Sequence, residues 1–436
     1  MLNKKTVSAY YIFFIIIICL SSILTAKYFV NNYPNIIDEN NNLILSNITY
    51  GWGDLINNLF NYQKYFTEKS FIFYDENFNE KIINIEKGSY VQKLPFLPLF
   101  TLAILHITTN FYYFLIIKNL IIYSFFYLIV YVSLKNLNKK IIFFVTITIF
   151  TIVNPYIFFH TSGLYMPEQY GILFIPCIYI LYLSSLNYKY EIISIFIFIL
   201  CLSKGTFLLF CIFNIFFFFI FEKKNYFKYK KYYPSVSLIL ATLIWGSWSY
   251  IKTDRFAIGA SSESLNSTMT ATAFNPNFHK YYPNLSVDLV PFNYSIPSNF
   301  INEWEVYDFF KKKNIEYLKN NKLRYFKDAF FKINFIFFNS NKDGHNIRDF
   351  NFKGDFKLYL LFNKLVINFT ILLNIFFLCK TFKKKEFIKH LYFFLAFFSL
   401  MCPLVLIWAT QKHLLPMVTL CLFYLIFNIK LKYLNS

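Results

Sequence analysis

The sequence predicts an all-α polytopic membrane protein with about ten transmembrane helices. Hydrophobic residues fill 57% of the 436 positions and charged residues only 15%, whereas soluble domains spend about a quarter of their positions on charge. Apolar runs such as 9–24 and 111–134 approach or exceed the roughly 20 residues that a bilayer-spanning helix needs. Lysines gather in short segments between these runs. A single soluble core is therefore excluded.

The distribution of lysine predicts the orientation. The segments that we expect to be cytoplasmic hold 18 lysines and three acidic residues, a net charge of +15. They are both termini, 135–140, 188–191, 222–231 and 380–389. The long loops 31–93 and 252–356 have net charges of −3 and +3, and short cytoplasmic loops are the ones that carry a Lys/Arg excess. We therefore expect a multi-pass protein of the bacterial inner (plasma) membrane with cytoplasmic termini, and no nucleic-acid partner despite a total charge of +20.

The first part of the chain contains one span and two shorter helical elements. Helix one covers about 8–30, and because no small-residue cleavage site follows it, we keep it as a span rather than a signal peptide. Residues 55–66 form an amphipathic helix in the first outer loop. The segment 94–110 is apolar but short and contains Pro95 and Pro98, so we expect an interfacial or re-entrant helix that does not cross.

The segment 192–221 must return the chain to the cytoplasm, which two short helices broken at Ser203-Lys204-Gly205 would achieve. The remaining spans are 111–134, 141–159, 170–188, 234–251, 357–379, 390–408 and 413–430. Three regions follow from this order: a membrane catalytic module at 1–251 that includes the outer loop 31–93, a second long outer loop at 252–356, and C-terminal transmembrane helices at 357–436.

Charged residues at the outer ends of helices are the candidate site. They are Asp54, Glu168, Lys204 and the pair Lys412-His413. An ionisable group in or beside a membrane is costly, so its default interpretation is functional. Each also has a structural explanation: Asp54 as a loop residue or helix cap, Glu168 as a partner of a helix dipole, Lys204 as a side chain that snorkels to the interface, and Lys412-His413 as an interfacial turn.

The cysteines and arginines differ in placement. All seven cysteines lie in apolar segments, so neither a disulfide framework nor a cysteine metal site is predicted, and we assign no metal ligands. The three arginines, Arg255, Arg324 and Arg348, all fall in the loop 252–356. Arginine binds phosphate and carboxylate in bidentate fashion, which lysine does not.

The order of these features resembles the C-type fold of membrane glycosyltransferases, the superfamily of protein mannosyltransferases and lipid A aminoarabinose transferases. The matching segments are Gly53-Asp54 before the amphipathic helix, Lys93-Leu94-Pro95, Tyr165-Met-Pro-Glu168, Ser203-Lys204-Gly205, Trp245–Trp248 with Lys252, Arg255 and Ser261-Ser262, and Lys412-His413-Leu-Leu-Pro416. The chain departs from the pattern at Gln92, where the aminoarabinose transferases carry an acidic residue, and at Leu55, where the protein mannosyltransferases complete an Asp-Glu pair.

The resemblance implies an inverting glycosyltransferase that moves a sugar from a polyprenyl-phosphate donor to a hydroxyl of a cell-envelope glycan, lipid or protein. It implies Asp54 as general base and Glu168 as second carboxylate. Lys93, Lys204, Arg255, Lys412 and His413 would bind the donor phosphate. No nucleotide is needed because the donor carries its own leaving group, and dependence on a divalent cation stays open.

Two other classes of protein remain as alternatives. A glycan polymerase or ligase would place its catalytic arginine and histidine in the loop 252–356, where Arg255, Arg324, Arg348, His279 and His345 are the candidates. A lipid or sugar transporter would carry charges at the bilayer midplane in discontinuous helices, often in repeated halves. We find no half-repeat in this sequence. The sugar and the acceptor stay open.

Overall fold

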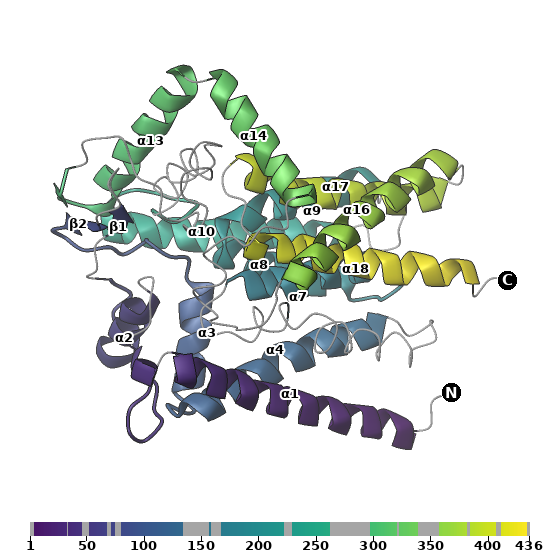
Figure 1. Cartoon of the computed structure of the whole chain (residues 1–436), viewed down its shortest axis with the longest axis horizontal. Coiled ribbons are helices and arrows are strands. Elements are labelled where there is room, and N and C mark those ends of the chain that lie inside the picture. Colours follow the sequence, from purple (N-terminus) through teal and green to yellow (C-terminus); the bar gives the residue numbers. More distant parts are fainter. Residues whose placement is uncertain are drawn as a thin grey trace. The chain divides into compact units, whose positions relative to one another are not determined.

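A computed structural model describes most of the chain. The described residues are 4–32, 34–45, 52–67, 71–74, 80–133, 157, 167–221, 229–261, 297–320, 322–338, 357–381, 384–406 and 411–433. Within these ranges the chain is predominantly helical and has one small sheet (Figure 1). The expected span at 141–159 falls outside the described residues except for residue 157.

Five helices in the described part of the chain are long and apolar enough to cross a membrane. They are Tyr11–Asn31, Phe111–Ser133, Lys230–Thr253, Leu358–Lys380 and Glu386–Leu406. Four shorter apolar helices accompany them, at Phe96–Leu105, Glu168–Leu183, Gly205–Phe221 and His413–Asn428. The expectation of a helical membrane protein is confirmed.

The chain forms two compact units, each assembled from two separate segments. The first unit contains Met1–Tyr65 and Phe96–Lys189, and the second contains Phe66–Pro95 and Tyr190–Ser436. The helices of the first unit are α1 (Lys4–Asn32), α2 (Trp52–Tyr62), α3 (Phe96–Leu105), α4 (Phe111–Ser133) and α7 (Glu168–Leu183). The segment between α2 and α3 thus contributes mainly to the second unit.

Antiparallel packing of α1 and α4 organises the first unit. Phe14 packs edge-on against Tyr127 with ring centroids 4.2 Å apart, and the Asn119 amide donates to the Ser22 hydroxyl at 2.9 Å. Residue numbers rise along one helix as they fall along the other, so α1 ends where α4 begins. Backbone bonds from Leu43 to Thr109 and from Phe111 to Asn41 close this end.

The short helix α3 lies at that same end of the first unit. Its ten residues cover only about 15 Å, half of a hydrocarbon core. Its Ile104 and Leu105 join a buried cluster with Ile56 of α2 and Phe111 and Phe114 of α4. As expected for 94–110, this segment contains a short helix. The chain enters α4 at the same end of the unit at which it left α1.

The second unit contains eight helices among its described residues. They are α8 (Lys189–Ser203), α9 (Leu208–Phe221), α10 (Tyr233–Thr253), α13 (Glu303–Asn320), α14 (Lys322–Phe337), α16 (Lys357–Lys380), α17 (Lys384–Leu406) and α18 (Gln411–Tyr433). A 3-10 turn, η4 (Gly205–Phe207), joins α8 to α9. The Tyr190 and Phe218 rings lie 6.0 Å apart at the open end of this pair, so the predicted break at Ser203-Lys204-Gly205 forms a helical hairpin.

Polar side chains connect α9, α16, α17 and α18, which we call the bundle. Tyr392 of α17 packs on Phe217 of α9 with ring centroids 4.8 Å apart, and its hydroxyl donates to Asn214. The Tyr424 hydroxyl of α18 lies 2.7 Å from His390 Nδ1 and accepts from the α16 side chain Asn374 at 2.9 Å. A buried polar group is costly unless it has a partner, so these pairs favour one packing arrangement.

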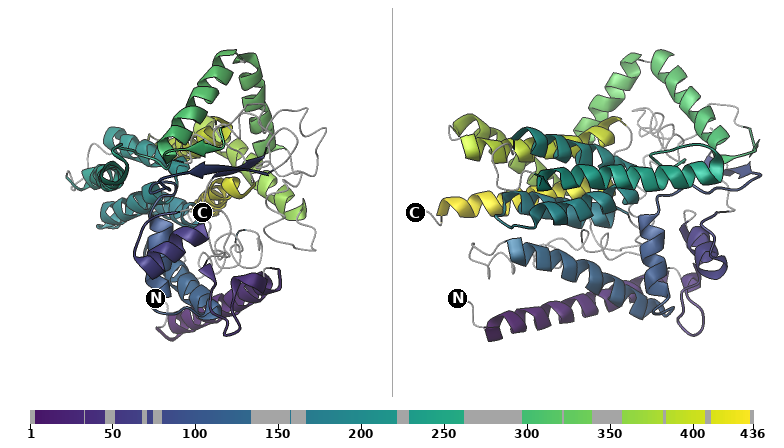
Figure 2. Two further views of the ribbon diagram at one scale, coloured as in Figure 1. Left: turned by 90° about the vertical axis from the view of Figure 1, so that its left-hand side faces the viewer. Right: turned by 180° about the vertical axis from the view of Figure 1, so that it is seen from behind.

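A three-stranded sheet, which the all-α prediction did not include, joins loop segments in the second unit (Figure 2). Strand β1 (Phe71–Tyr74) pairs antiparallel with β2 (Glu80–Ile85), and β2 pairs parallel with β3 (Asn299–Phe300). The turn after β2 contains Gly88 at φ +68°, where a Cβ would lie 2.1 Å from the Phe66 ring. Strands this short give a weak sequence signal, because cross-strand neighbours stabilise them rather than local propensity.

Several helices begin earlier than expected. α2 begins at Trp52, α7 at Glu168, α17 at Lys384 and α18 at Gln411. Asp54, Glu168 and the pair Lys412-His413 therefore lie within first helical turns rather than in the preceding loops. Helix boundaries are the least certain part of a sequence prediction, because polar residues are tolerated in a first turn whose N–H groups lack helical partners.

Candidate functional site

The two candidate carboxylates belong to the first unit. Asp54 is half-buried in the first turn of α2, and Glu168 is buried as the first residue of α7. Both helices pack against α3: α2 does so through its buried face, and α7 through Tyr170, whose ring lies 4.9 Å from that of Phe96. Asp54 and Glu168 thus lie at the same end of this unit, where α1 ends and α4 begins.

A carboxylate in a first helical turn is also favoured electrostatically, because the unpaired N–H groups there carry partial positive charge. Asp54 and Glu168 are the acidic first-turn residues of their helices. The dipole explanation therefore holds at both positions. It does not exclude a chemical role, since a general base must be ionised to accept a proton.

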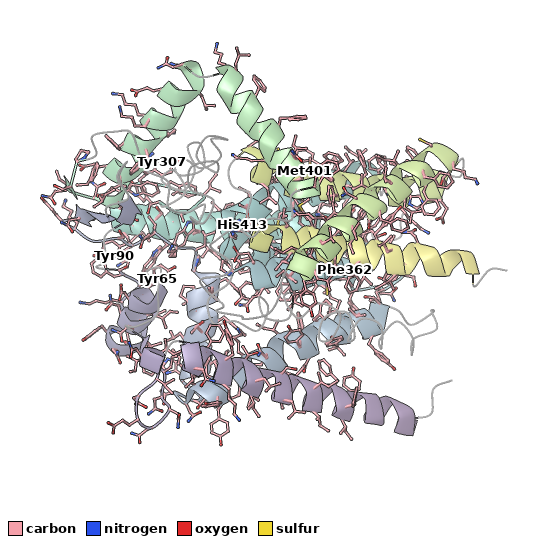
Figure 3. All side chains as sticks on the ribbon, viewed as in Figure 1. Tyr65, Tyr90, Tyr307, Phe362, Met401 and His413 are labelled. Atoms are coloured by element: carbon pink, nitrogen blue, oxygen red, sulfur yellow. The ribbon has the colours of Figure 1, made fainter. Side chains whose placement is uncertain are left out.

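The lysine at the hairpin break belongs to the second unit. Lys204 has an extended backbone (φ −159°, ψ 131°) between the end of α8 and η4, and its side chain is half-buried. α17 packs on both α9 and η4. Phe218, near the open end of the hairpin, has its ring 6.3 Å from that of Tyr392 in the early half of α17. The hairpin tip, η4, therefore lies beside the later half of α17, the end from which the chain continues to α18. His413, near the start of α18, is buried (Figure 3).

Arg255 and Lys93 lie at this same end of the second unit. α10 starts beside the end of α9, where the Lys231 ammonium lies 5.4 Å from the centre of the Phe219 ring. The 21 residues of α10 cover about 31 Å, whereas α9 covers about 21 Å. Arg255 follows α10 and so lies roughly 10 Å beyond the level of the hairpin tip. The half-buried Lys93 follows Tyr90, whose carbonyl accepts from the Trp248 indole of α10 at 3.4 Å.

Arg255 makes an aromatic and ionic cluster with α13. Its guanidinium donates to both Asp308 oxygens, at 2.7 and 3.0 Å, and lies 4.6 Å from the Trp304 ring and 5.2 Å from the Tyr307 ring. The hydrogen bonds from Arg255 to Asp308 raise the pKa of Arg255 above its ordinary value. Figure 3 places Tyr307 on α13 at the end of the unit where Tyr90 lies.

A buried carboxylate, Glu303, fastens three segments together at this end. It accepts the backbone N–H of Tyr90 at 2.8 Å and that of Val91 at 3.1 Å, and the Ser261 hydroxyl donates to it. Ser261 also donates its backbone N–H to the Val91 carbonyl at 2.9 Å. Burial raises the pKa of the Glu303 carboxyl, and the hydrogen bonds from Ser261, Tyr90 and Val91 oppose that shift. Glu303 therefore fixes the loop that carries Lys93.

Sequence reasoning missed Glu303 and also Lys118. The Asn302-Glu-Trp-Glu305 pattern could have indicated a helix start, because Asn302 caps α13 by accepting from the N–H groups of Trp304 and Glu305 at 3.0 and 3.1 Å. Lys118 is 1% exposed within α4, and its interruption of an apolar run was visible in the sequence. An ionisable group at such a place is a functional candidate by default.

Several expected residues belong to the parts of the chain that the structure does not describe. Ser262, His279, His345 and Arg348 lie outside the described residues, as do the side chains of Lys412 and Arg324. Across the described ranges no group of three or more His, Cys, Asp or Glu side chains has an arrangement that could hold a metal ion.

Comparisons of the chain with protein-family models, with curated proteins and with solved structures find no match.

Proposed function

We propose that the protein is an inverting membrane glycosyltransferase that takes its sugar from a polyprenyl-phosphate donor. It acts on the outer face of the bacterial inner membrane, crosses that membrane about ten times and has both termini in the cytoplasm. The acceptor is a hydroxyl group of an envelope glycan, a lipid or a protein. The observation that carries the proposal is Lys204, a cation on an extended break between two short apolar helices of one hairpin.

A cation at this depth suits a phosphate that arrives on a lipid. α8 and α9 contain 15 and 14 residues, about 21–22 Å each, so a hairpin rooted at one surface ends short of the opposite edge of a 30 Å hydrocarbon core. A water-soluble nucleotide would have to enter the bilayer to reach Lys204. A polyprenyl phosphate has its tail in the bilayer already and its phosphate near the interface.

The remaining roles follow from the chemistry of transfer. Asp54 takes the proton of the acceptor hydroxyl while the hydroxyl oxygen attacks the anomeric carbon. The bond between that carbon and the phosphate oxygen breaks, and its electron pair leaves with the phosphate. Cations stabilise the leaving phosphate, which in a water-poor site is usually the larger contribution to the rate. Glu168 orients the acceptor.

The proposal is supported by the grouping within each unit. The two carboxylates lie at one end of the first unit. In the second unit Lys93, Lys204, Arg255 and His413 lie toward one end. Lys412 lies beside His413 in the first turn of α18. The meeting of the carboxylates with the cations at one cavity stays a prediction.

Transfer assays in membranes test this assignment. Lys204→Ala should raise the KM for a polyprenyl-phosphate sugar, because a cation that holds the donor is lost. Asp54→Asn should instead lower kcat by about 10²–10⁴-fold, the usual contribution of a general base, with donor binding retained. The matched control is Lys231→Ala, which lies beside the opposite end of this hairpin, over the Phe219 ring. Unchanged kinetics in both Lys204→Ala and Asp54→Asn would contradict the proposal.

A further inference from the structure

Helix α14 combines a buried face with an exposed apolar face. Lys332 and Ile336 are 2% and 0% exposed, whereas Leu323, Phe326 and Phe330 are 80%, 70% and 72% exposed. The spacing of the three exposed residues, i, i+3 and i+7, places them on one side of the helix, opposite the buried pair. Three large apolar side chains exposed to water on a single stripe would be unfavourable, so the stripe indicates a contact surface.

The last turn of α14 is held inside the membrane bundle. The Lys364 ammonium of α16 donates to the carbonyl of Ile336 at 3.0 Å, and the Asn368 amide donates to the carbonyl of Phe337 at 2.7 Å. The Phe337 ring lies 6.3 Å from that of Phe397 in α17. The C-terminal end of α14 therefore contacts two candidate membrane spans.

The positions of these contacts give a depth. Lys364 and Asn368 lie six and ten residues inside the span Leu358–Lys380, which corresponds to about 9 and 15 Å along the helix. Phe397 lies nine residues inside the span Glu386–Leu406, about 14 Å from the end of that span. α14 thus ends roughly 10 Å below the end of the bundle.

The hydrogen bonds explain why a lysine and an asparagine occupy an apolar span. The last carbonyls of a helix lack partners within the helix, and in hydrocarbon no water replaces those partners. Lys364, 2% exposed, and Asn368 supply two of the missing donors. Such capping would be unnecessary if α14 ended in water.

The direction of α14 agrees with a location at the membrane surface. The views in Figures 1 and 2 agree that α14 runs sideways from its junction with α13 to the bundle, across the direction of α16, α17 and α18. A helix with this direction and this depth keeps its exposed side chains near the level of the acyl chains.

We propose that α14 is an interfacial helix of the bilayer and that Leu323, Phe326 and Phe330 contact the acyl chains of one leaflet. The region 252–356 is then not a purely aqueous loop, because α14 inserts into the leaflet beside the bundle. We assign lipid as the partner of the stripe because the stripe lies at the depth of the acyl chains. A soluble partner would have to reach the stripe below the membrane surface, and cover by a second copy of the chain is an outcome that the quenching test detects.

The experiment uses full-length protein in vesicles of phosphatidylethanolamine and phosphatidylglycerol. The exposed Cys379 and the half-buried Cys19 and Cys402 are first changed to alanine. Phe326→Cys and Phe330→Cys are then labelled, in separate proteins, with an environment-sensitive fluorophore. The matched control is Lys312→Cys on the exposed surface of α13.

Lipids brominated in their acyl chains should quench the labels at 326 and 330 and leave the label at 312 bright, whereas aqueous iodide should do the reverse. Quenching of positions 326 and 330 by iodide alone would overturn the proposal. Protection from both quenchers would also overturn it, because protein would then cover the stripe. Leu323→Cys replaces either variant that fails to elute as wild type on gel filtration.

Discussion

Replacing Glu303 by alanine should loosen the loop that carries Lys93. The carboxylate accepts the N–H groups of Tyr90 and Val91 and the hydroxyl of Ser261. Alanine would leave these donors without their acceptor, and a buried donor without a partner costs roughly 1–3 kcal/mol. Loss of a buried charge returns part of this cost. We expect local opening of the loop to become easier by about 2–4 kcal/mol.

Hydrogen exchange measures this opening directly. A change of about 1.4 kcal/mol corresponds to a tenfold change in an equilibrium constant, so the amides of Tyr90 and Val91 should exchange between about 30- and 700-fold faster in Glu303→Ala. Glu303→Gln is the matched control, because its amide oxygen still accepts one of the N–H groups. Exchange at these two amides that stays within about threefold of wild type in Glu303→Ala would refute the role of Glu303 as the fastening residue.

The raised pKa of Glu303 makes the stability of this loop depend on pH, and the direction of that dependence follows from the shift. Burial favours the protonated carboxyl in the folded protein, so the stability that this group contributes is complete below its unfolded pKa of 4.5 and is lost as pH rises through the raised folded pKa. Protection of Tyr90 and Val91 should therefore increase on acidification toward pH 4.5 in the wild type and stay flat in Glu303→Gln. A wild-type profile of the opposite slope would contradict the assignment.

Two further predictions concern neighbouring residues. Gly88→Ala should lower the yield of folded protein and expose the loop to protease, because φ is +68° and the new Cβ would overlap the Phe66 ring. The expected loss of folding stability is above about 1 kcal/mol, and wild-type resistance to protease would contradict the prediction. Asp308→Asn should change stability by no more than about 1 kcal/mol, because the ion pair is solvent-exposed, but it should leave the Arg255 guanidinium available to a phosphate. Donor KM should then stay equal or fall in Asp308→Asn and rise in Arg255→Gln; a rise in both would indicate that the pair has a structural role only.

Some features of the site follow from local chemistry and were predicted from the sequence. The helical hairpin centred on Lys204 is an example, because the run is too long for one helix and the Ser-Lys-Gly break interrupts it. The placement of Asp54 and Glu168 was predicted less well. Both lie inside first turns, where a carboxylate is stabilised by free N–H groups and so gives no sharp boundary in the sequence.

The sequence by itself determined that this is a helical membrane protein and where the 192–221 segment turns. The thickness of the hydrocarbon core sets the length of a spanning helix, and the core disfavours charged residues. Both constraints are visible in the sequence. Only the tertiary structure decided that Glu303 fastens Tyr90, 213 positions away, and that Lys364 caps α14. These contacts depend on which segments meet after folding. A glutamate beside a helix start and a lysine within an apolar run are the traces that such contacts leave in the sequence.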